Sequence, residues 1–180
     1  MAKVFAAVLV VTVVLIVVLQ FVDPAVDSRT IEQVTTTALA EGSISVSIDG
    51  EVVRTGTYIM EANTTLASLI EVASGVTANA DELAYDTSYV LADGLSFYIA
   101  PKYDNSDVCS LEPIKKVNIN KDNAETLQTV SGIGSSVANK IVSHRSANGE
   151  FKRIEDIKDV SGVGNATFEK IKNYLVLRSA

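Results

Sequence analysis

Hydrophobic residues are concentrated first in one long run near the amino terminus of this 180-residue chain. Residues 4–22 carry no charge, and Thr12 and Gln20 are the only polar residues among them. As a helix, this run would span roughly 28 Å, about the thickness of the hydrocarbon core of a bilayer. The pattern therefore predicts a transmembrane anchor over residues 4–22, preceded by a short segment at residues 1–3.

A cleaved secretory signal is the alternative interpretation of the same run. The apolar part of such a signal is about 7–15 residues long, and a small-x-small cleavage site follows it closely. Here the run is longer, and the sequence FVDPAVD after it offers no good site. The stretch Ala38-Leu39-Ala40 has suitable residues but lies too far downstream. An uncleaved anchor is therefore the preferred interpretation.

The charges beside the run predict its orientation in the membrane. Lys3 and the amino terminus precede it, whereas Asp23 and Asp27 follow it. Because positively charged flanks stay on the cytoplasmic side, we expect residues 1–3 in the cytoplasm and everything after residue 22 outside the cell. The chain would then be a single-pass protein of the cell membrane.

After the anchor, the pattern changes to that of a small α+β domain. Residues 23–42 contain Pro24, several threonines and scattered charges, which favours a stalk. Polar and apolar residues then alternate with period two, with one helix-spaced segment between the alternating ones. The expected strands are 43–48, 51–60 with a break at Gly56, 88–92 and 96–100, and the expected helix is 64–74. This order predicts one helix laid across a sheet in a domain over residues 43–101.

The rest of the chain is expected to be a linker and an all-α domain. Residues 102–116 lack periodicity and contain a proline, which is typical of a linker. Residues 117–177 show four short helix-spaced apolar faces. The first helix is expected to begin with Asp122 as its cap and Glu125 at the third position. Asn148-Gly149 is expected to end the second helix.

One short turn occurs twice in this all-α region. VSGIGSSVANKI at residues 130–141 is followed by VSGVGNATFEKI at residues 160–171, so each Gly-x-Gly lies between two helices. Glycine accepts a positive φ, so the chain can turn back tightly there. The next helix then begins with backbone N–H groups that have no intrahelical acceptor, at the positive end of its dipole. Such a turn can hold a phosphate oxygen without a charged side chain.

The side chains around the two turns are also placed alike. The middle residues, Ile133 and Val163, are apolar and are expected to be buried between the helices. Lys140 and Lys170 each lie six residues beyond the second glycine of their turn. A single Gly-x-Gly is weak evidence, because helix turns use glycine for steric reasons alone, and solvation is an equally good account of the lysines. Two matching turns in register are more specific.

The charge of the chain is divided unevenly. The net charge of −7 by itself argues against a nucleic-acid partner. However, residues 23–113 carry three basic and fifteen acidic residues, a net of −12, whereas residues 114–180 carry eleven basic and seven acidic residues, a net of +4. Such asymmetry suggests a division of labour between the two parts. On charge alone, an ordinary solvated surface accounts for the excess of four.

Longer motifs around the turns point to a family. The paired turns resemble the helix-hairpin-helix module, which binds duplex DNA from the minor-groove side through backbone phosphates. Residues 117–164 resemble more closely the carboxyl-terminal domain of the ComEA-type competence DNA receptors. The matching residues are Asn118, Asn120, Ala124, Leu127, Arg145, Asn148, Gly149 and Phe151. The resemblance implies binding of double-stranded DNA without sequence preference, for delivery to a DNA-uptake channel protein during natural transformation.

One departure from the pattern changes the expected DNA contacts. Many such hairpins have a basic residue two positions after the second glycine, where this chain has Ser136 and Ala166. The contacts are therefore expected to come from backbone donors, neighbouring polar side chains and nearby cations, with Arg145 and Lys172 among the cations. The candidate DNA-binding residues are Gly132, Ile133, Gly134, Ser135, Ser136, Lys140, Gly162, Val163, Gly164, Asn165, Ala166 and Lys170.

The domain over residues 43–101 resembles a second module, the soluble-ligand-binding β-grasp (SLBB) domain. The matching residues are Gly50, Val52, Gly56 and Tyr58. Thr55 replaces the usual proline, and Ser74-Gly75 replaces the usual Gly-Gly. The resemblance implies binding of a soluble ligand or saccharide. Because no polar cluster identifies a ligand, a spacer or interaction domain, including one for self-association, is the preferred interpretation.

The same residues also bear on other function classes. A surface adhesion or assembly protein, binding saccharide or protein through the β-grasp domain, is the second hypothesis. An enzyme is not expected, because the carboxylates are scattered and the only histidine, His144, has no cysteine partner. Cys109 is the only cysteine, which excludes an intramolecular disulfide and a cysteine-based metal site. No cofactor or metal is expected.

Overall fold

The computed structural model describes residues 42–104 and 113–179. The expected anchor at residues 4–22 and the single cysteine, Cys109, lie outside the described residues. Among the helices in the described ranges, none has both the length and the hydropathy of a membrane span. Both described ranges belong to one compact unit.

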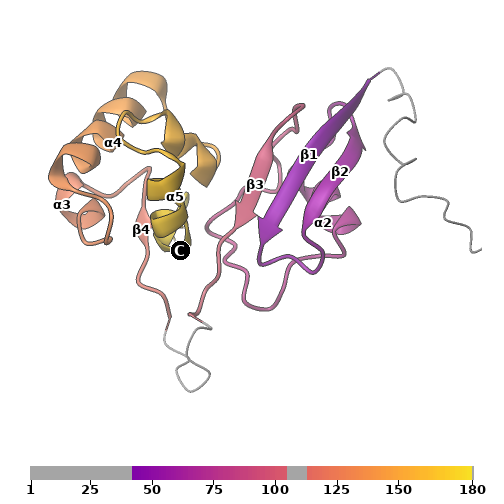
Figure 1. The fold of residues 1–180 in the computed structure, drawn as a ribbon, viewed down its shortest axis with the longest axis horizontal. Helices are drawn as coiled ribbons and strands as arrows, with labels where there is room; N and C mark the ends of the chain where they lie inside the picture. Colours follow the sequence, from indigo (N-terminus) through magenta and orange to yellow (C-terminus); the bar gives the residue numbers. More distant parts are fainter. Residues whose placement is uncertain (1–41, 105–112, 180) are drawn as a thin grey trace, which may run out of the picture. The chain divides into compact units, whose positions relative to one another are not determined.

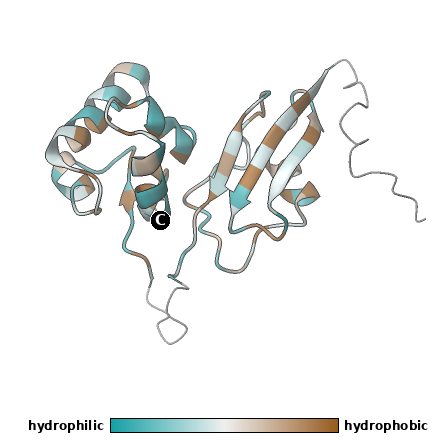
Figure 2. Cartoon of the chain, in the orientation of Figure 1, coloured by the Kyte–Doolittle hydropathy of each residue, from teal (hydrophilic) through white to brown (hydrophobic). Residues whose placement is uncertain are grey.

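The first part of this unit, residues 42–104, is called the β lobe and is built on a sheet of order β2-β1-β3 (Figure 1). Its strands are β1 at Ser43–Gly50, β2 at Gly56–Glu61 and β3 at Ser96–Ile99. β1 pairs antiparallel with β2 and parallel with β3. Apolar and polar residues alternate along β1 (Figure 2), as period-two side-chain alternation requires when one face of a sheet is buried.

One helix packs against the buried face of this sheet. It is α2 at Leu66–Val72, within the predicted range of 64–74. Leu66 and Leu69 of α2 join Val46, Ile48 and Ile99 of the sheet in one core, and all five are at most 1% exposed. The helix-spaced apolar residues of the sequence therefore face the sheet, as expected.

The segment at residues 88–92 does not form the predicted strand. Only Val90 forms a bridge, with Thr65, and the Val90 side chain is 55% exposed. Thr65 begins α2 without a side-chain capping hydrogen bond, and Leu66 N donates instead to Tyr89 O at 2.8 Å. The backbone of this segment thus serves the first turn of α2, and it does not join the sheet.

The second part, residues 113–179, is called the hairpin lobe and consists of short helices closed by a two-stranded ladder. The elements are β4 at Val117–Asn118, α3 at Ala124–Leu127, α4 at Ser135–Asn148, a 3-10 helix η1 at Ile154–Asp159, α5 at Asn165–Ile171, a 3-10 helix η2 at Lys172–Tyr174 and β5 at Leu175–Val176. β4 and β5 are parallel, although they stand at opposite ends of the lobe's sequence. The four predicted helical segments are therefore present, the third of them as a 3-10 helix.

Of the two helix ends predicted for this lobe, one is confirmed and one is wrong. α4 ends as predicted, with Gly149 at its carboxyl end in a positive-φ conformation, φ 90°. The cap of α3 was predicted wrongly, because Asn123 accepts the hydrogen bond from Thr126 N at 2.8 Å. Asp122 instead accepts a hydrogen bond from Asn118 N at 2.7 Å, which fixes the chain before the helix.

Candidate nucleic-acid interface

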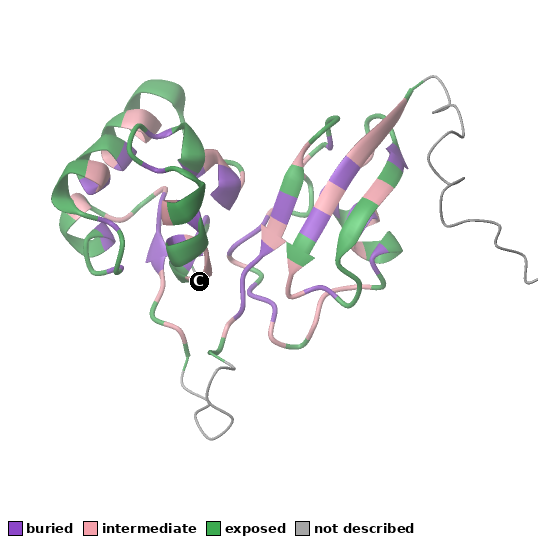
Figure 3. Cartoon of the chain, viewed as in Figure 1, coloured by how far each residue is buried: buried purple, intermediate pink, exposed green. Residues whose placement is uncertain are grey.

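The two copies of the repeated turn fold alike. Over residues 131–140 and 161–170, both copies run through a two-residue turn, two irregular residues and six helical residues. The order of buried, intermediate and exposed positions is also the same in both. Much of the surface of α4 and α5 beyond the turns is exposed (Figure 3). The sequence repeat is therefore a structural repeat that presents two equivalent turns to solvent.

The first glycine of each turn is required by the backbone. Gly132 has φ 109° and Gly162 has φ 104°, a region that side chains rarely adopt. Space is also limited, because a Cβ on Gly132 would lie 3.0 Å from Ile171 Cγ2, and one on Gly162 would lie 3.4 Å from Val137 Cγ2. Each first glycine thus packs against the helix of the other repeat.

The second glycine of each turn is not required by the backbone conformation or by the packing. Gly134 has φ −79° and Gly164 has φ −91°, values that any residue adopts, and each is the N-cap of the helix that follows. A Cβ at either position would meet no atom within 4 Å. A side chain at the N-cap lies beside the first N–H groups of its helix. The missing side chain therefore leaves those N–H groups open to an approaching ligand.

The N–H groups behind Gly134 and Gly164 have no acceptor within their helices. The first helical hydrogen bonds run from Ala138 N to Gly134 O and from Phe168 N to Gly164 O, each at 2.9 Å. The N–H groups of residues 135–137 and 165–167 therefore have no partner within the helix. They point along the helix axis at its positive end. Each turn can accept an anion.

The middle residues of the turns offer neither a side chain nor an N–H group to a ligand, because Ile133 N donates to Val130 O at 3.0 Å and Val163 N donates to Val160 O at 2.9 Å. Ile133 and Val163 are each 3% exposed and lie in the core of the lobe. Their burial confirms the prediction that they anchor the turns between the helices. Ser135, Ser136 and Ala166, in contrast, are exposed beside the turns.

The repeated lysines lie next to the turn of the opposite repeat. Lys140 Nζ is 3.5 Å from Ser161 Oγ and 3.9 Å from the Cβ position of Gly162. Lys170 Cβ is 3.8 Å from the Cβ position of Gly132. Spacing along the sequence assigned each lysine to its own turn, whereas packing brings it to the other one. The Lys140 ammonium therefore lies beside the second turn, and the base of the Lys170 side chain lies beside the first.

Two other cations named as DNA contacts have structural partners. The Arg145 guanidinium donates to Ile119 O at 2.8 Å and to Asp122 O at 2.7 Å, so it ties α4 to the segment before α3. Lys172 Nζ lies 2.6 Å from the Glu169 carboxylate and 4.1 Å from the centre of the Tyr98 ring. These contacts engage both side chains away from the turns.

Several motif residues likewise hold the lobe together. Asn120 Nδ2 donates to Phe151 O at 3.0 Å, and Phe151 N donates to Asn120 Oδ1 at 2.8 Å. His144 stacks on Phe151 with ring centres 5.2 Å apart, in keeping with a structural role for the only histidine. Within residues 42–104 and 113–179, no group of three or more His, Cys, Asp or Glu side chains could hold a metal ion.

Comparisons with known proteins agree with this geometry. Residues 112–176 match the family model of the helix-hairpin-helix motif. The chain is 36% identical over 145 residues to ComE operon protein 1 of Bacillus subtilis (strain 168), and the match covers 76% of this chain and 71% of that protein.

A shorter segment of the chain is similar to a second group of proteins. Over 58 residues, the chain is 43% identical to endonuclease/exonuclease/phosphatase family domain-containing protein 1 of Xenopus laevis and 41% identical to that of Homo sapiens. Each match covers 32% of this chain but only 10% of the relative. So small a share of those proteins gives no reason to assign their named activity to this chain.

Proposed function

Because this chain belongs to the ComEA family of helix-hairpin-helix DNA receptors, we propose that its two glycine turns bind the backbone phosphates of double-stranded DNA without sequence preference. The observation that carries the proposal is the pair of equivalent exposed turns, each with open N–H groups behind a glycine N-cap. Contacts to phosphates position a protein on DNA but carry no base information. The turns therefore suit a receptor that must accept any sequence.

The residues that make these contacts fall into three groups. Backbone amides come from residues 135–137 and 165–167, whose N–H groups have no acceptor in their helices, and polar side chains come from Ser135, Ser136 and Asn165. Lys140 and Lys170 add charge at the opposite turns. Arg145 and Lys172 are left out of the proposed interface because their partners lie elsewhere in the protein.

The cellular role rests on the regions flanking the hairpin lobe. The apolar run at residues 4–22 would anchor the protein in the cell membrane, with the amino terminus in the cytoplasm and residues 23–180 outside. In this arrangement, the receptor binds DNA outside the cell and delivers it to a channel protein for uptake in natural transformation. The SLBB-like β lobe would act as a spacer or interaction domain between stalk and hairpin lobe.

The salt dependence of DNA binding tests the proposed mechanism. The full chain in detergent micelles should bind random duplexes of different sequence with equal affinity. With about four to six phosphate contacts, log K should fall against log salt with a slope of about −4 to −5, because bound cations are released from the DNA. Electrophoretic shifts at several salt concentrations measure this slope, and binding that ignores salt would rule the mechanism out.

A matched variant separates the lysines from the amides in the same assay. Replacing Lys140 and Lys170 by alanine should reduce the magnitude of the slope by about 2 while leaving salt-dependent binding in place. An unchanged slope would remove these two side chains from the interface without removing the turns.

A further inference from the structure

The outer edge of β3 is covered by side chains of the hairpin lobe. β3 pairs with β1 on one side only, so polar groups of its backbone on the other side need partners. Arg153 donates to Ser96 O at 3.2 Å, and Tyr98 N donates to the Glu155 carboxylate. Arg153, the N-cap of η1, and Glu155 within η1 thus supply hydrogen-bond partners to a strand that is distant in sequence.

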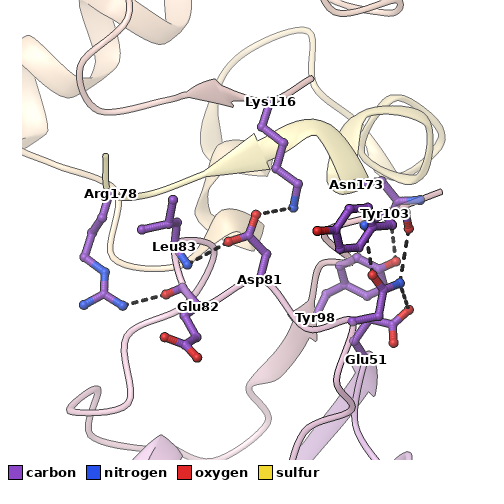
Figure 4. A network of polar contacts seen from close by, with 10 residues as sticks. Glu51, Asp81, Glu82, Leu83, Tyr98, Tyr103, Lys116, Asn173 and Arg178 are labelled. Atoms are coloured by element: carbon purple, nitrogen blue, oxygen red, sulfur yellow. Dashed lines mark hydrogen bonds and ion pairs between the residues drawn. The ribbon is translucent and has the colours of Figure 1, made fainter. Parts of the chain in front are cut away.

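Further polar contacts join the two lobes around this edge. The Tyr98 hydroxyl donates to Asn173 Oδ1 at 2.6 Å, and Lys116 pairs with Asp81 at 2.8 Å (Figure 4). Arg178 donates to Glu82 O at 2.6 Å. Leu83, Ala84 and Ala100 of the β lobe also pack against the apolar core of the hairpin lobe. The contacts made by ionisable side chains depend, in addition, on the charge state of those groups.

Among these groups, the charge state of Glu155 is the most sensitive to pH, because its carboxyl group is buried without a cationic partner. Its side chain is 5% exposed, and none of the ion pairs found in the described residues includes it. Arg153, whose charge acts on Glu155, is itself engaged with Asp156 at 2.6 Å. An ionised carboxylate in such a place loses hydration without gaining a salt bridge.

The charge of Glu155 is set by groups from several elements. Burial raises its pKa to about 7, while its hydrogen bonds and the Arg153 charge act in the opposite direction and Asp156 raises it further. The titratable and charged groups that share the two clefts beside it are Asp49 of β1, Tyr85, Asp86 and Tyr89 of the β lobe, Tyr98 of β3, Lys152, Arg153 and Lys158 around η1, and Glu169 and Lys172 around α5. Burial raises the pKa of Tyr98 to about 12, so its hydroxyl remains a donor throughout the neutral range.

We propose that protonation of Glu155 controls the contact between β3 and η1, so that acid strengthens the docking of the hairpin lobe on the β lobe and alkali weakens it. The docked carboxyl holds its proton to a higher pH than an exposed glutamate does. Between the two pKa values, the docked state therefore binds more protons than the separated state, and docking weakens as the pH rises. Separation would also release Lys172 from the Tyr98 ring.

Amide exchange at Tyr98 tests the proposal without DNA. This N–H donates only to Glu155, so its protection factor reports the docked fraction. In the full chain in detergent micelles, the factor should fall about tenfold between pH 6 and pH 8, as follows from a carboxyl pKa near 4.5 when exposed and near 7 when docked. Amides that pair β1 with β2 should keep their protection, because their partners lie within the β lobe.

Two variants decide between Glu155 and other titrating groups. Glu155→Gln keeps the size and one acceptor oxygen but cannot ionise, so its Tyr98 protection should be the same at both pH values. Glu150→Gln, at an exposed position of the same lobe, should behave like the unmodified chain. The proposal is overturned if Tyr98 protection in the unmodified chain does not depend on pH, or if Glu155→Gln loses protection to the same extent.

Discussion

Replacing both Gly134 and Gly164 by alanine should weaken duplex binding by about 100-fold or more while the protein stays folded. Both glycines have ordinary φ values, and a Cβ would meet no atom within 4 Å. The methyl groups would stand beside the open amides, where the phosphate oxygen must approach. A hydrogen bond to a charged group contributes about 1.5–3 kcal/mol, so losing one at each turn gives an effect of this size.

The stability of this double variant is the necessary companion measurement. Alanine is a poorer N-cap than glycine, which should cost about 0.5–1 kcal/mol at each helix. Urea denaturation should therefore show a loss of about 1–2 kcal/mol, too small to unfold a domain of ordinary stability. A folded double variant that binds duplex as tightly as the unmodified chain would show that the turns are not the DNA-binding surface.

Replacing Gly132 by alanine should, unlike the Gly134 and Gly164 double variant, cause a large loss of stability. The residue would be forced to φ 109°, and its Cβ would lie 3.0 Å from the buried Ile171 side chain. Backbone strain of this kind costs about 1–3 kcal/mol, and forcing a methyl group into a packed core adds a similar amount. We expect a loss of about 2–6 kcal/mol in the free energy of unfolding, measured from the urea midpoint.

Gly162 provides the matched comparison for this prediction. It has a similar backbone, φ 104°, but a Cβ there would lie at an ordinary contact distance, 3.4 Å, from Val137 Cγ2. Gly162→Ala should therefore lose less stability, about 1–3 kcal/mol from backbone strain alone. Losses under 0.5 kcal/mol in both variants would contradict the conformational role assigned to the first glycines.

The local features of the hairpin lobe could be predicted from the sequence. A repeat of twelve residues located both turns, and the apolar middle residues Ile133 and Val163 were predicted to be buried, which the structure confirms. Helix ends were less certain, since Asp122 and Asn123 are both good N-cap residues. Their sequence gives no sign that Asp122 is already engaged with Asn118 N.

The features that were missed depend on contacts between distant parts of the chain. Residues 88–92 have the alternation of a strand, yet their backbone serves α2 because Thr65 provides no side-chain cap. Arg145 and Lys172 are basic residues in a DNA-binding lobe, but carbonyl groups and the Tyr98 ring engage them. Glu155 reads as an exposed helical glutamate, and nothing near it in sequence predicts Tyr98 as its partner.

A titration of the isotope-labelled chain with a random duplex, followed by the backbone amide resonances, tests the account most directly. The amides of Ser135, Ser136, Asn165 and Ala166 should show the largest shifts, equally for duplexes of different sequence, while the amides of β1 stay in place. If the largest shifts appear in the β lobe, or if the amides of both turns remain unchanged while DNA binds, the claim that paired glycine turns hold the phosphates is wrong.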